Sequence, residues 1–310
     1  MVELPDLNYA RFEVKIVART LLELPPFKGS TLRGGFGNAF RRAVCVTRKR
    51  DCDSCILRDN CVYSYVFETP VPEGAEVLKK MPRAPHPFVL EPPLDDKRRY
   101  EPGEALEFGI ILMGRGIQYL PYFILAFEML GDLGLGRNKG KFSVAEVRNG
   151  QKIIYSGGKL NTRYKSGSMK EFGDGGFERN DLEIEFLTPT RMLFRGERVD
   201  VPEFHVIVRN LLRRLHLLNY FHGNEPYSPD FKGIIRRAED VKLKKAEVRA
   251  DSVLRYSRRQ DRKVSMYGFT GKFTYSGEIR DFLPLLKAGE VVHIGKATAF
   301  GFGKYKIREV

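Results

Sequence analysis

The sequence predicts an α+β protein made of two tandem ferredoxin-like βαββαβ domains, with a cysteine-rich insertion in the first domain. Three observations indicate this fold class. Strand-like and helix-like segments follow the same order in both halves, a stretch rich in Gly, Ser and charge separates the halves, and a basic glycine-rich loop follows the second helix of each. We expect residues 1–172 to form the first domain and residues 173–310 the second.

In the first half, alternating apolar and polar residues at positions 9–22 are typical of a strand. Ser30 and Thr31 are suited to cap a helix that continues to Val44. The apolar runs that follow predict two strands, a second helix and a closing strand or hairpin, at residues 88–91, 106–113, 119–133, 142–147 and 152–155.

The second half repeats this order. Its long helix is expected at residues 203–221, where apolar residues recur at helical spacing. The other predicted elements are a first strand, two central strands, a short helix and a last strand, at residues 182–187, 241–254, 266–275, 281–287 and 302–307. Residues 164–180 form the expected linker.

The charge of the chain favours a polyanionic partner. It has 53 Lys and Arg against 39 Asp and Glu, a formal net charge of +14, and each neutralised phosphate would release counterions and add affinity. The alternative is a basic surface without such a partner. The apolar stretch at residues 119–135 is short for a membrane span and contains Glu128 and Asp132. No signal-peptide pattern opens the chain, so we expect a cytoplasmic protein without a membrane partner.

The glycine-rich loops at residues 134–142 and 295–305 are the first candidate site. Glycine lets backbone N–H groups approach a phosphate closely, and aromatic residues such as Phe302 and Tyr305 could stack on bases. The alternative is that the glycines permit tight packing of helix on strand and that the aromatics are core. The predicted RNA-binding residues of the two loops are Arg137, Lys139, Lys141, Gly295, Thr298, Phe300, Gly301, Gly303 and Lys304.

Four cysteines, Cys45, Cys52, Cys55 and Cys61, form the second candidate site. The pair Cys52 and Cys55 has the spacing of a zinc knuckle, and two more thiolates complete a tetrahedral set of ligands. Such a closed site is structural, because no coordination position remains for water. Zinc is favoured, although an iron–sulfur cluster accepts the same ligands. Unligated reduced thiols are the alternative.

An arginine-rich run at residues 255–263 lies between two predicted strands. Arg255, Arg258 and Arg259 could clamp an RNA stem, or the run could be a solvated loop.

Five histidines offer acid–base chemistry. His205 and His216 lie within the long helix, where a structural role is favoured, and His86 between two prolines carries no functional signal. His222 ends that helix and His293 precedes the C-terminal loop. Either could exchange a proton with RNA, or could be structural.

Several of these segments resemble a known family. LRGGFGNAFRR at residues 32–42, the cysteine knuckle, LLNYFH at 217–222, RYSRRQ at 255–260 and GKATAFGFGKY at 295–305 are similar to the RAMP superfamily of CRISPR-associated proteins. They resemble most the precursor-crRNA-processing endoribonucleases, the sixth-numbered Cas family. The C-terminal segment is the most specific, and the knuckle marks a subgroup.

This resemblance implies cleavage of CRISPR repeat RNA without a catalytic metal. The 2′-hydroxyl would attack the scissile phosphate and leave a 2′,3′-cyclic phosphate. Many members place a catalytic His on or beside the first helix of the N-terminal domain, but residues 30–44 contain none. The predicted catalytic set is therefore His293, Lys296 and Tyr256, with His222 in reserve.

Two other function classes remain open. One is a non-catalytic RAMP subunit that holds crRNA in an effector complex, and the other is a zinc-bearing ribosomal or RNA-modification accessory protein. The expected partners are repeat RNA and other Cas effector subunits, with the chain itself a monomer or homodimer.

Overall fold

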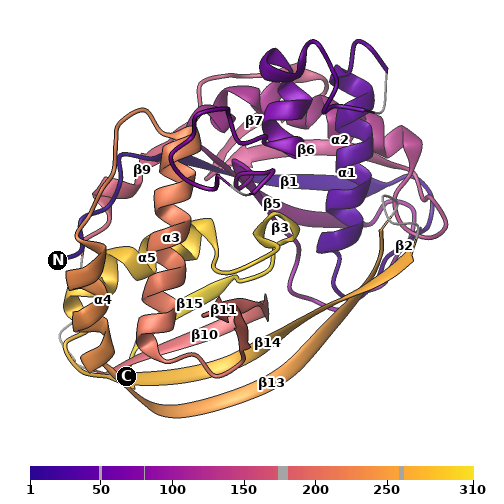
Figure 1. Ribbon diagram of the computed structural model, residues 1–310. Helices are drawn as coiled ribbons and strands as arrows, with labels where there is room; N and C mark the ends of the chain where they lie inside the picture. Colours follow the sequence, from indigo (N-terminus) through magenta and orange to yellow (C-terminus); the bar gives the residue numbers. More distant parts are fainter. Residues whose placement is uncertain (49–50, 80, 174–180, 258–261) are drawn as a thin grey trace. The chain divides into compact units, whose positions relative to one another are not determined.

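The computed structural model describes residues 1–48, 51–79, 81–173, 181–257 and 262–310, without the side chains of residues 254–264 (Figure 1). The chain divides into two compact units. One comprises Asn8–Gly167, and the other comprises Met1–Leu7 with Ser168–Val310. The boundary predicted from the sequence follows residue 172, whereas the compact units divide between Gly167 and Ser168.

The N-terminal unit is a βαββαβ fold with additions. Its sheet has the order β3-β5-β1-β6, and each of these neighbouring pairs is antiparallel. Helices α1 and α2 pack against each other and cover the sheet. The six elements of the unit are β1 (Asn8–Ala18), α1 (Gly29–Val44), β3 (Phe88–Glu91), β5 (Ala105–Met113), α2 (Leu120–Leu133) and β6 (Phe142–Asn149).

The additions lie before α1, between α1 and β5, and after β6. The cysteine-rich insertion contains the short helix η1 (Arg58–Asn60) and the π-helix η2 (Ser64–Glu68), and β2 (Leu22–Glu23) pairs with β4 (Arg99–Tyr100). The sheet continues beyond β6 through β7 (Lys152–Ser156) and β8 (Lys159–Leu160).

Aromatic rings fill the core of this unit. Phe36 of α1 stacks on Phe127 of α2 with ring centroids 4.6 Å apart, and Phe67 of η2 lies 5.4 Å from Phe36. A Cβ at Gly37 would come 2.7 Å from the Phe67 ring. The glycine therefore lets the insertion pack directly on α1, which offsets the conformational cost of glycine within a helix.

The C-terminal unit repeats the topology. Its sheet order is β13-β14-β10-β15, again with antiparallel neighbours. If the first strand of each unit is called strand one, both sheets have the order two-three-one-four, so the predicted tandem ferredoxin-like fold is confirmed. The elements are β10 (Asp181–Thr190), α3 (Phe204–His222), α4 (Phe231–Asp240), β13 (Lys242–Ser257), β14 (Arg262–Ser276), α5 (Leu283–Val292) and β15 (Tyr305–Glu309), with the hairpin β11 (Met192–Phe194) and β12 (Glu197–Val199) after β10.

Some predicted boundaries were wrong. Ser30 and Thr31 lie inside α1, which follows Lys28 without a side-chain cap. The buried Lys28 ammonium instead donates to the Asp95 carboxylate and holds the start of the helix, with Nζ 3.1 Å from Oδ1. Helix α5 extends five residues beyond the prediction, and β15 begins at Tyr305 rather than at Phe302 because the intervening residues turn.

Within the described ranges, no helix is long and apolar enough to cross a membrane.

Candidate RNA-binding surfaces and catalytic groups

The two glycine-rich loops occupy equivalent places in the two units. Each follows the second helix of its βαββαβ unit and leads into the last strand, which pairs with the first strand of that unit. The correspondence expected from the sequence is confirmed.

Several backbone amides of the C-terminal loop donate hydrogen bonds to other groups of the same chain. The Lys296 N–H donates to the carbonyl of Arg191 at 2.9 Å, and the Gly303 N–H donates to the carbonyl of Pro189 at 3.1 Å. The Lys304 N–H donates to the Thr188 hydroxyl at 2.9 Å. These three amides are therefore not available to bind a phosphate, and the predicted backbone cradle is wrong for them.

Close packing accounts for the glycines of this loop. A Cβ at Gly295 would lie 2.3 Å from the carbonyl oxygen of Arg191, and a Cβ at Gly303 would lie 1.8 Å from that of Ile294. Both glycines have positive φ. Phe302 and Tyr305 are each 1% exposed, so the prediction that they stack on bases is wrong. Phe300 is half-buried, and Thr298 and Gly301 are buried.

A cluster of cations remains at the surface of this loop. Burial, followed by the charges of Arg213 and Arg191, lowers the pKa of the Lys296 ammonium. All three residues are exposed at the surface, and the Lys296 ammonium is partly desolvated. We call Arg191, Arg213 and Lys296 the Lys296 cluster. Arg191 follows β10 and Arg213 lies on α3, so no local sequence pattern identified them.

The neighbouring Arg214 has a structural position. Its Nε donates to the carbonyl of Val292 at 2.7 Å and so ties the end of α5 to α3. Burial lowers the pKa of this guanidinium to about 9.

The N-terminal loop fits closely on residues 21–23. A Cβ at Gly136 or Gly140 would lie 2.2 Å from a carbonyl oxygen of that segment. Asn138 Nδ2 donates to the carbonyl of Leu21 at 2.7 Å. The Lys141 ammonium donates to the carbonyl of Asp132. Of the three predicted cations, Arg137 and Lys139 are exposed, and Lys141 is half-buried.

The two predicted catalytic histidines are both buried. His293 is 0% exposed and its Nδ1–H donates to the carbonyl of Phe302 at 3.0 Å. His222, at the end of α3, is 1% exposed. Neither ring lies at the surface in this structure, and their catalytic roles stay predictions.

The described residues of the arginine-rich run, 255–257 and 262–263, are paired as strands. Arg255 lies opposite Val264, and Tyr256 lies opposite Lys263, in the hairpin of β13 and β14. The side chains of Arg255 and Tyr256 are not described, and Arg258 and Arg259 lie outside the described residues. Their roles in RNA binding and catalysis also stay predictions.

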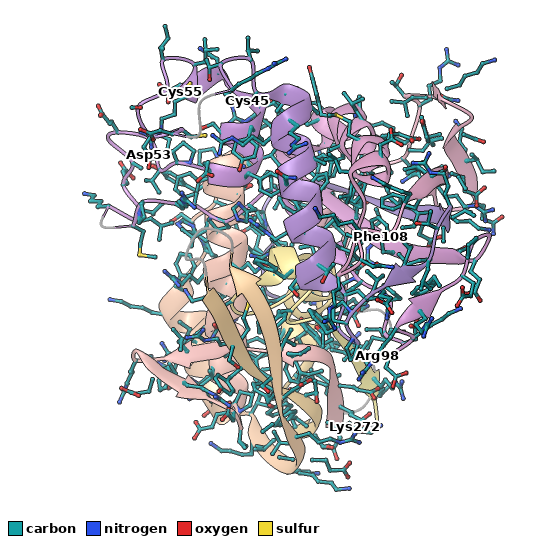
Figure 2. The ribbon with its side chains drawn as sticks, turned by 90° about the vertical axis from the view of Figure 1, so that its right-hand side faces the viewer. Cys45, Asp53, Cys55, Arg98, Phe108 and Lys272 are labelled. Carbon is teal, nitrogen blue, oxygen red and sulfur yellow. The ribbon has the colours of Figure 1, made fainter. Side chains whose placement is uncertain are left out.

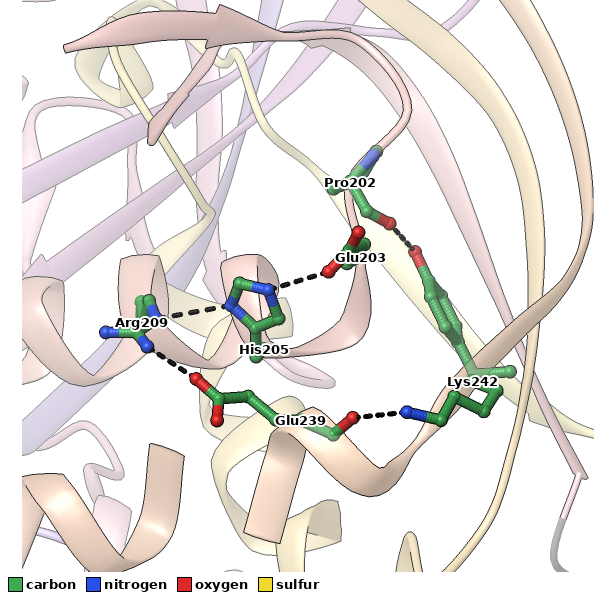
Figure 3. Close-up of polar contacts among 7 residues, drawn as sticks. Pro202, Glu203, His205, Arg209, Glu239 and Lys242 are labelled. Carbon is green, nitrogen blue, oxygen red and sulfur yellow. Dashed lines mark hydrogen bonds and ion pairs between the residues drawn. The ribbon is translucent and has the colours of Figure 1, made fainter. Parts of the chain in front are cut away.

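His205 joins helices α3 and α4 through a charged network (Figure 3). Arg209 Nε donates to His205 Nδ1 at 3.2 Å, and His205 Nε2 lies 2.8 Å from the Glu203 carboxylate. Arg209 also donates to Glu239 on α4 at 2.9 Å. Two carboxylates thus satisfy this histidine and its arginine, in keeping with the expected structural role.

His86, for which no role was predicted from the sequence, has well-defined partners. Nη2 of Arg33 on α1 lies 3.1 Å from His86 Nε2. The Thr69 hydroxyl lies 3.0 Å from His86 Nδ1. The ring is only half-buried, in contrast to those of His222 and His293. Contacts among residues 33, 69 and 86 arise only from the fold, so the sequence pattern could not reveal them.

The four cysteines are half-buried free thiols, and Cys45 is the residue at which α1 ends. Figure 2 shows Cys45 and Cys55 at the same end of the insertion. A tight turn joins Cys52 and Cys55, with the Cys55 N–H donating to the Cys52 carbonyl at 3.4 Å. Burial raises the pKa of the Cys52 thiol, and the nearby Cys61 and Cys45 act in the same direction. Among the described residues, no three potential ligands are already arranged to hold a metal ion.

A shallow hollow of 240 Å³ at β7 and β8 is lined by Ile153, Tyr155 and Leu160, among others, and by none of the predicted site residues.

The fold and these surfaces define a tandem ferredoxin-like protein with two basic loops, whose glycines allow them to pack closely on the rest of their units. Residues 184–305 match the family model of the CRISPR-associated endoribonuclease Cas6, and residues 7–167, more than half of the chain, match a model described as the AF_1859 N-terminal domain. The chain belongs to the family of this N-terminal model, and its second domain is a Cas6 domain. The resemblance to this family inferred from the sequence motifs is thereby confirmed, whereas the subgroup inferred from the cysteine knuckle stays a prediction.

Similar proteins match over nearly the whole chain. An uncharacterized protein of Archaeoglobus fulgidus is 29% identical over 291 residues, which cover 92% of this chain and 93% of that protein. A product complex of Thermus thermophilus Cas6 superposes with a TM-score of 0.60 at 17% identity, covering 97% of this chain and 100% of the other. A Cas6-RT-Cas1–Cas2 complex also gives 0.60 at 12% identity, covering 99% of this chain and 29% of that one. At these identities the structures show a shared fold.

The close packing of the C-terminal loop predicts unequal effects of two glycine substitutions. Gly196 and Gly303 both have positive φ, but a Cβ at Gly196 meets nothing within 4 Å. Gly196→Ala should lower the free energy of unfolding by about 1 kcal/mol through backbone strain alone. Gly303→Ala should cost roughly 1–3 kcal/mol more, because the loop must move away from Ile294. Urea denaturation measures both values, and equal losses would contradict the packing role.

Proposed function

We propose that this chain is a metal-independent endoribonuclease that binds CRISPR repeat RNA and cleaves precursor crRNA. The 2′-hydroxyl upstream of the cut attacks the phosphate, which leaves a 2′,3′-cyclic phosphate and a 5′-hydroxyl. The observation that carries this proposal is the Cas6 domain over residues 184–305, which includes the exposed Lys296 cluster.

The chemistry of the Lys296 cluster supports RNA binding. Three like charges held together repel one another, and a phosphate relieves the repulsion while releasing its counterions. The hydrogen bonds of the loop to residues 188–191 fix the Lys296 backbone, so little conformational entropy is lost on binding. The exposed Arg137 and Lys139 give the N-terminal unit similar side chains in the equivalent loop.

The alternative is a RAMP subunit that binds crRNA in an effector complex without cutting it. The burial of His222 and His293 bears on this alternative, since a buried imidazole cannot exchange protons with RNA unless the structure opens. Cleavage therefore requires another proton acceptor or an opening of the structure.

Cleavage of labelled repeat RNA in EDTA tests the two functions. We expect a single cut and a product whose 2′,3′-cyclic phosphate resists phosphatase until acid opens it. No metal is needed, because the nucleophile is the 2′-hydroxyl of the RNA and protein cations can stabilise the charged transition state. Repeat RNA with a 2′-deoxy nucleotide upstream of the cut is the control and should bind but stay intact. Tight binding of the normal RNA without products would establish the subunit function instead.

The Lys296 cluster predicts a trade between stability and RNA affinity. Burial and its neighbours lower the pKa of Lys296 in the folded state, so the unfolded chain binds more protons near that pKa and stability rises as the pH rises through it. At pH 7 the charged ammonium thus opposes folding. Lys296→Met should raise the free energy of unfolding and reduce the slope of log K against log salt by about 0.7–0.9.

The matched control for this prediction is Lys232→Met, which changes an exposed lysine on α4. Fluorescence anisotropy over a salt series and urea denaturation give the two quantities. An unchanged salt slope in Lys296→Met would contradict a phosphate contact at Lys296, and lower stability would contradict the cost of holding the ammonium there.

We propose further that Cys45, Cys52, Cys55 and Cys61 bind a structural zinc ion. The turn between Cys52 and Cys55 and the electrostatic proximity of Cys52 to Cys45 and Cys61 support this proposal. Because such sites form together with the metal, zinc binding would bring the four thiols of the insertion together.

Metal analysis of protein purified without chelator should give about one zinc per chain. Cys52→Ser should lose the metal and lower the midpoint of thermal unfolding, whereas Asp59→Asn, an exposed change in the same insertion, should keep both. A visible absorption band with bound iron would point to a cluster instead, and wild-type protein without metal would refute the site.

A further inference from the structure

A directed chain of hydrogen bonds runs through His86 at the surface of the N-terminal unit. Arg33 can only donate, so His86 Nε2 accepts its hydrogen bond at 3.1 Å. The Thr69 hydroxyl lies 3.1 Å from the carbonyl of Tyr65, which can only accept. Thr69 therefore donates to Tyr65 and accepts from His86 Nδ1–H at 3.0 Å. The partners thus assign one neutral tautomer, with the basic lone pair on Nε2.

Rigid surroundings hold this imidazole in place. Pro85 and Pro87 restrict the backbone on both sides of His86. Its ring stacks on Phe88 with centroids 5.6 Å apart and an interplanar angle of 23°. Thr69 ends the π-helix η2 at a φ of 42°, a left-handed conformation that is costly for a β-branched residue. Strained backbone of this kind persists where the surroundings enforce it, often at functional sites.

Several charged groups adjoin the hydrogen-bonded chain of His86. Arg33 bonds the ring itself, and the Arg115 guanidinium lies over the Tyr65 ring, 5.2 Å from its centroid. Arg83, three residues before His86, pairs with Glu68, which precedes Thr69. These described contacts involve three guanidinium groups and one carboxylate. The network of His205 differs, because Glu203 and Glu239 balance it (Figure 3). An anion is therefore the ligand that the His86 group would attract.

We infer that His86 is the proton acceptor for the attacking 2′-hydroxyl of the RNA, with Arg33 as the cation on the scissile phosphate. This inference rests on the proposed ribonuclease function. Phosphate oxygens form charge-assisted, bidentate hydrogen bonds with a guanidinium, so they compete effectively with the imidazole for Arg33. The transfer of Arg33 to the phosphate frees the Nε2 lone pair.

The reaction then proceeds by a balanced set of steps. His86 Nε2 takes the proton of the 2′-hydroxyl, and the 2′-oxygen forms a bond to phosphorus. The bond from phosphorus to the 5′-oxygen breaks with its electron pair on that oxygen, which takes a proton from water. The imidazolium returns its proton to the solvent, so no cofactor or redox partner is needed. Arg33 stabilises the charge on the phosphorane, and Thr69 is a positioning residue that holds Nδ1–H.

Single-turnover cleavage of repeat RNA in EDTA tests this assignment. His86→Asn keeps a donor for Thr69 but has no basic nitrogen, so cleavage should slow by roughly 10²–10⁴-fold. RNA binding by anisotropy should change by less than about 3-fold, because Arg33 remains. His205→Asn is the matched control, and its rate should equal that of the wild type.

Thr69 provides an independent test of positioning. Thr69→Val removes the acceptor of the Nδ1–H and destabilises the imidazolium, so the acid limb of the pH–rate profile should move to lower pH. Thr69→Ser should restore the wild-type profile. Arg33, which bonds the ring, and the nearby charged residues of the chain, Arg83, Arg115 and Glu68, are the same in both variants.

The outcomes separate the two levels of inference. Wild-type protein that binds repeat RNA but never cuts it refutes both the nuclease function and the role of His86. If the wild type cuts, a His86→Asn variant that is folded, binds RNA and cuts at the wild-type rate overturns the His86 assignment alone. A loss of cleavage that merely parallels a loss of RNA affinity also overturns it, because His86 would then be a binding residue.

Discussion

Each glycine-rich loop closely approaches the end of the first strand of its unit or the segment after that strand. This close approach constrains the rest of the unit. In the C-terminal unit, Gly303 packs on the carbonyl of Ile294 and donates to that of Pro189. In the N-terminal unit, Gly136 and Gly140 approach carbonyl oxygens of residues 21–23 in the same way. These contacts fix where the second helix ends and where the last strand enters the sheet, and no side chain larger than hydrogen fits at these positions.

Binding groups on this frame are therefore side chains more than backbone. Amides that hold the loop to β10 cannot also bind a phosphate, but they fix the position of Lys296 beside Arg191 and Arg213. The mutual repulsion of these cations lowers the free energy of unfolding locally, and the packing of the loop offsets it. A surface that is destabilised by like charge when free and relieved by a polyanion is suited to RNA.

The sequence predicted the fold well and the site only in part. The periodicity of apolar residues and the repeated order of the segments identified both βαββαβ units. Within each amphipathic segment, the spacing of apolar residues alone indicates which face is buried. The same patterns could not show that Phe302 and Tyr305 are core residues or that Arg213 would meet Lys296, since these facts depend on contacts between distant segments. The segment from Pro85 to Pro87 was uninformative for the same reason: its partners lie on α1 and at the end of a π-helix.

Burial decides among the histidines as candidates for acid–base chemistry. His293 contributes to the fold by bonding the carbonyl of Phe302, and proton exchange with RNA would require that the loop open. His205 reaches the surface region but is committed to a carboxylate. His86 differs from His293 because its partner at Nε2, Arg33, is a group that a phosphate can recruit. It differs from His205 because Glu203 and Glu239 hold His205 and its own arginine, Arg209. An imidazole whose lone pair is held by a phosphate-binding cation becomes available when the substrate arrives, which couples RNA binding to proton transfer without any larger conformational change.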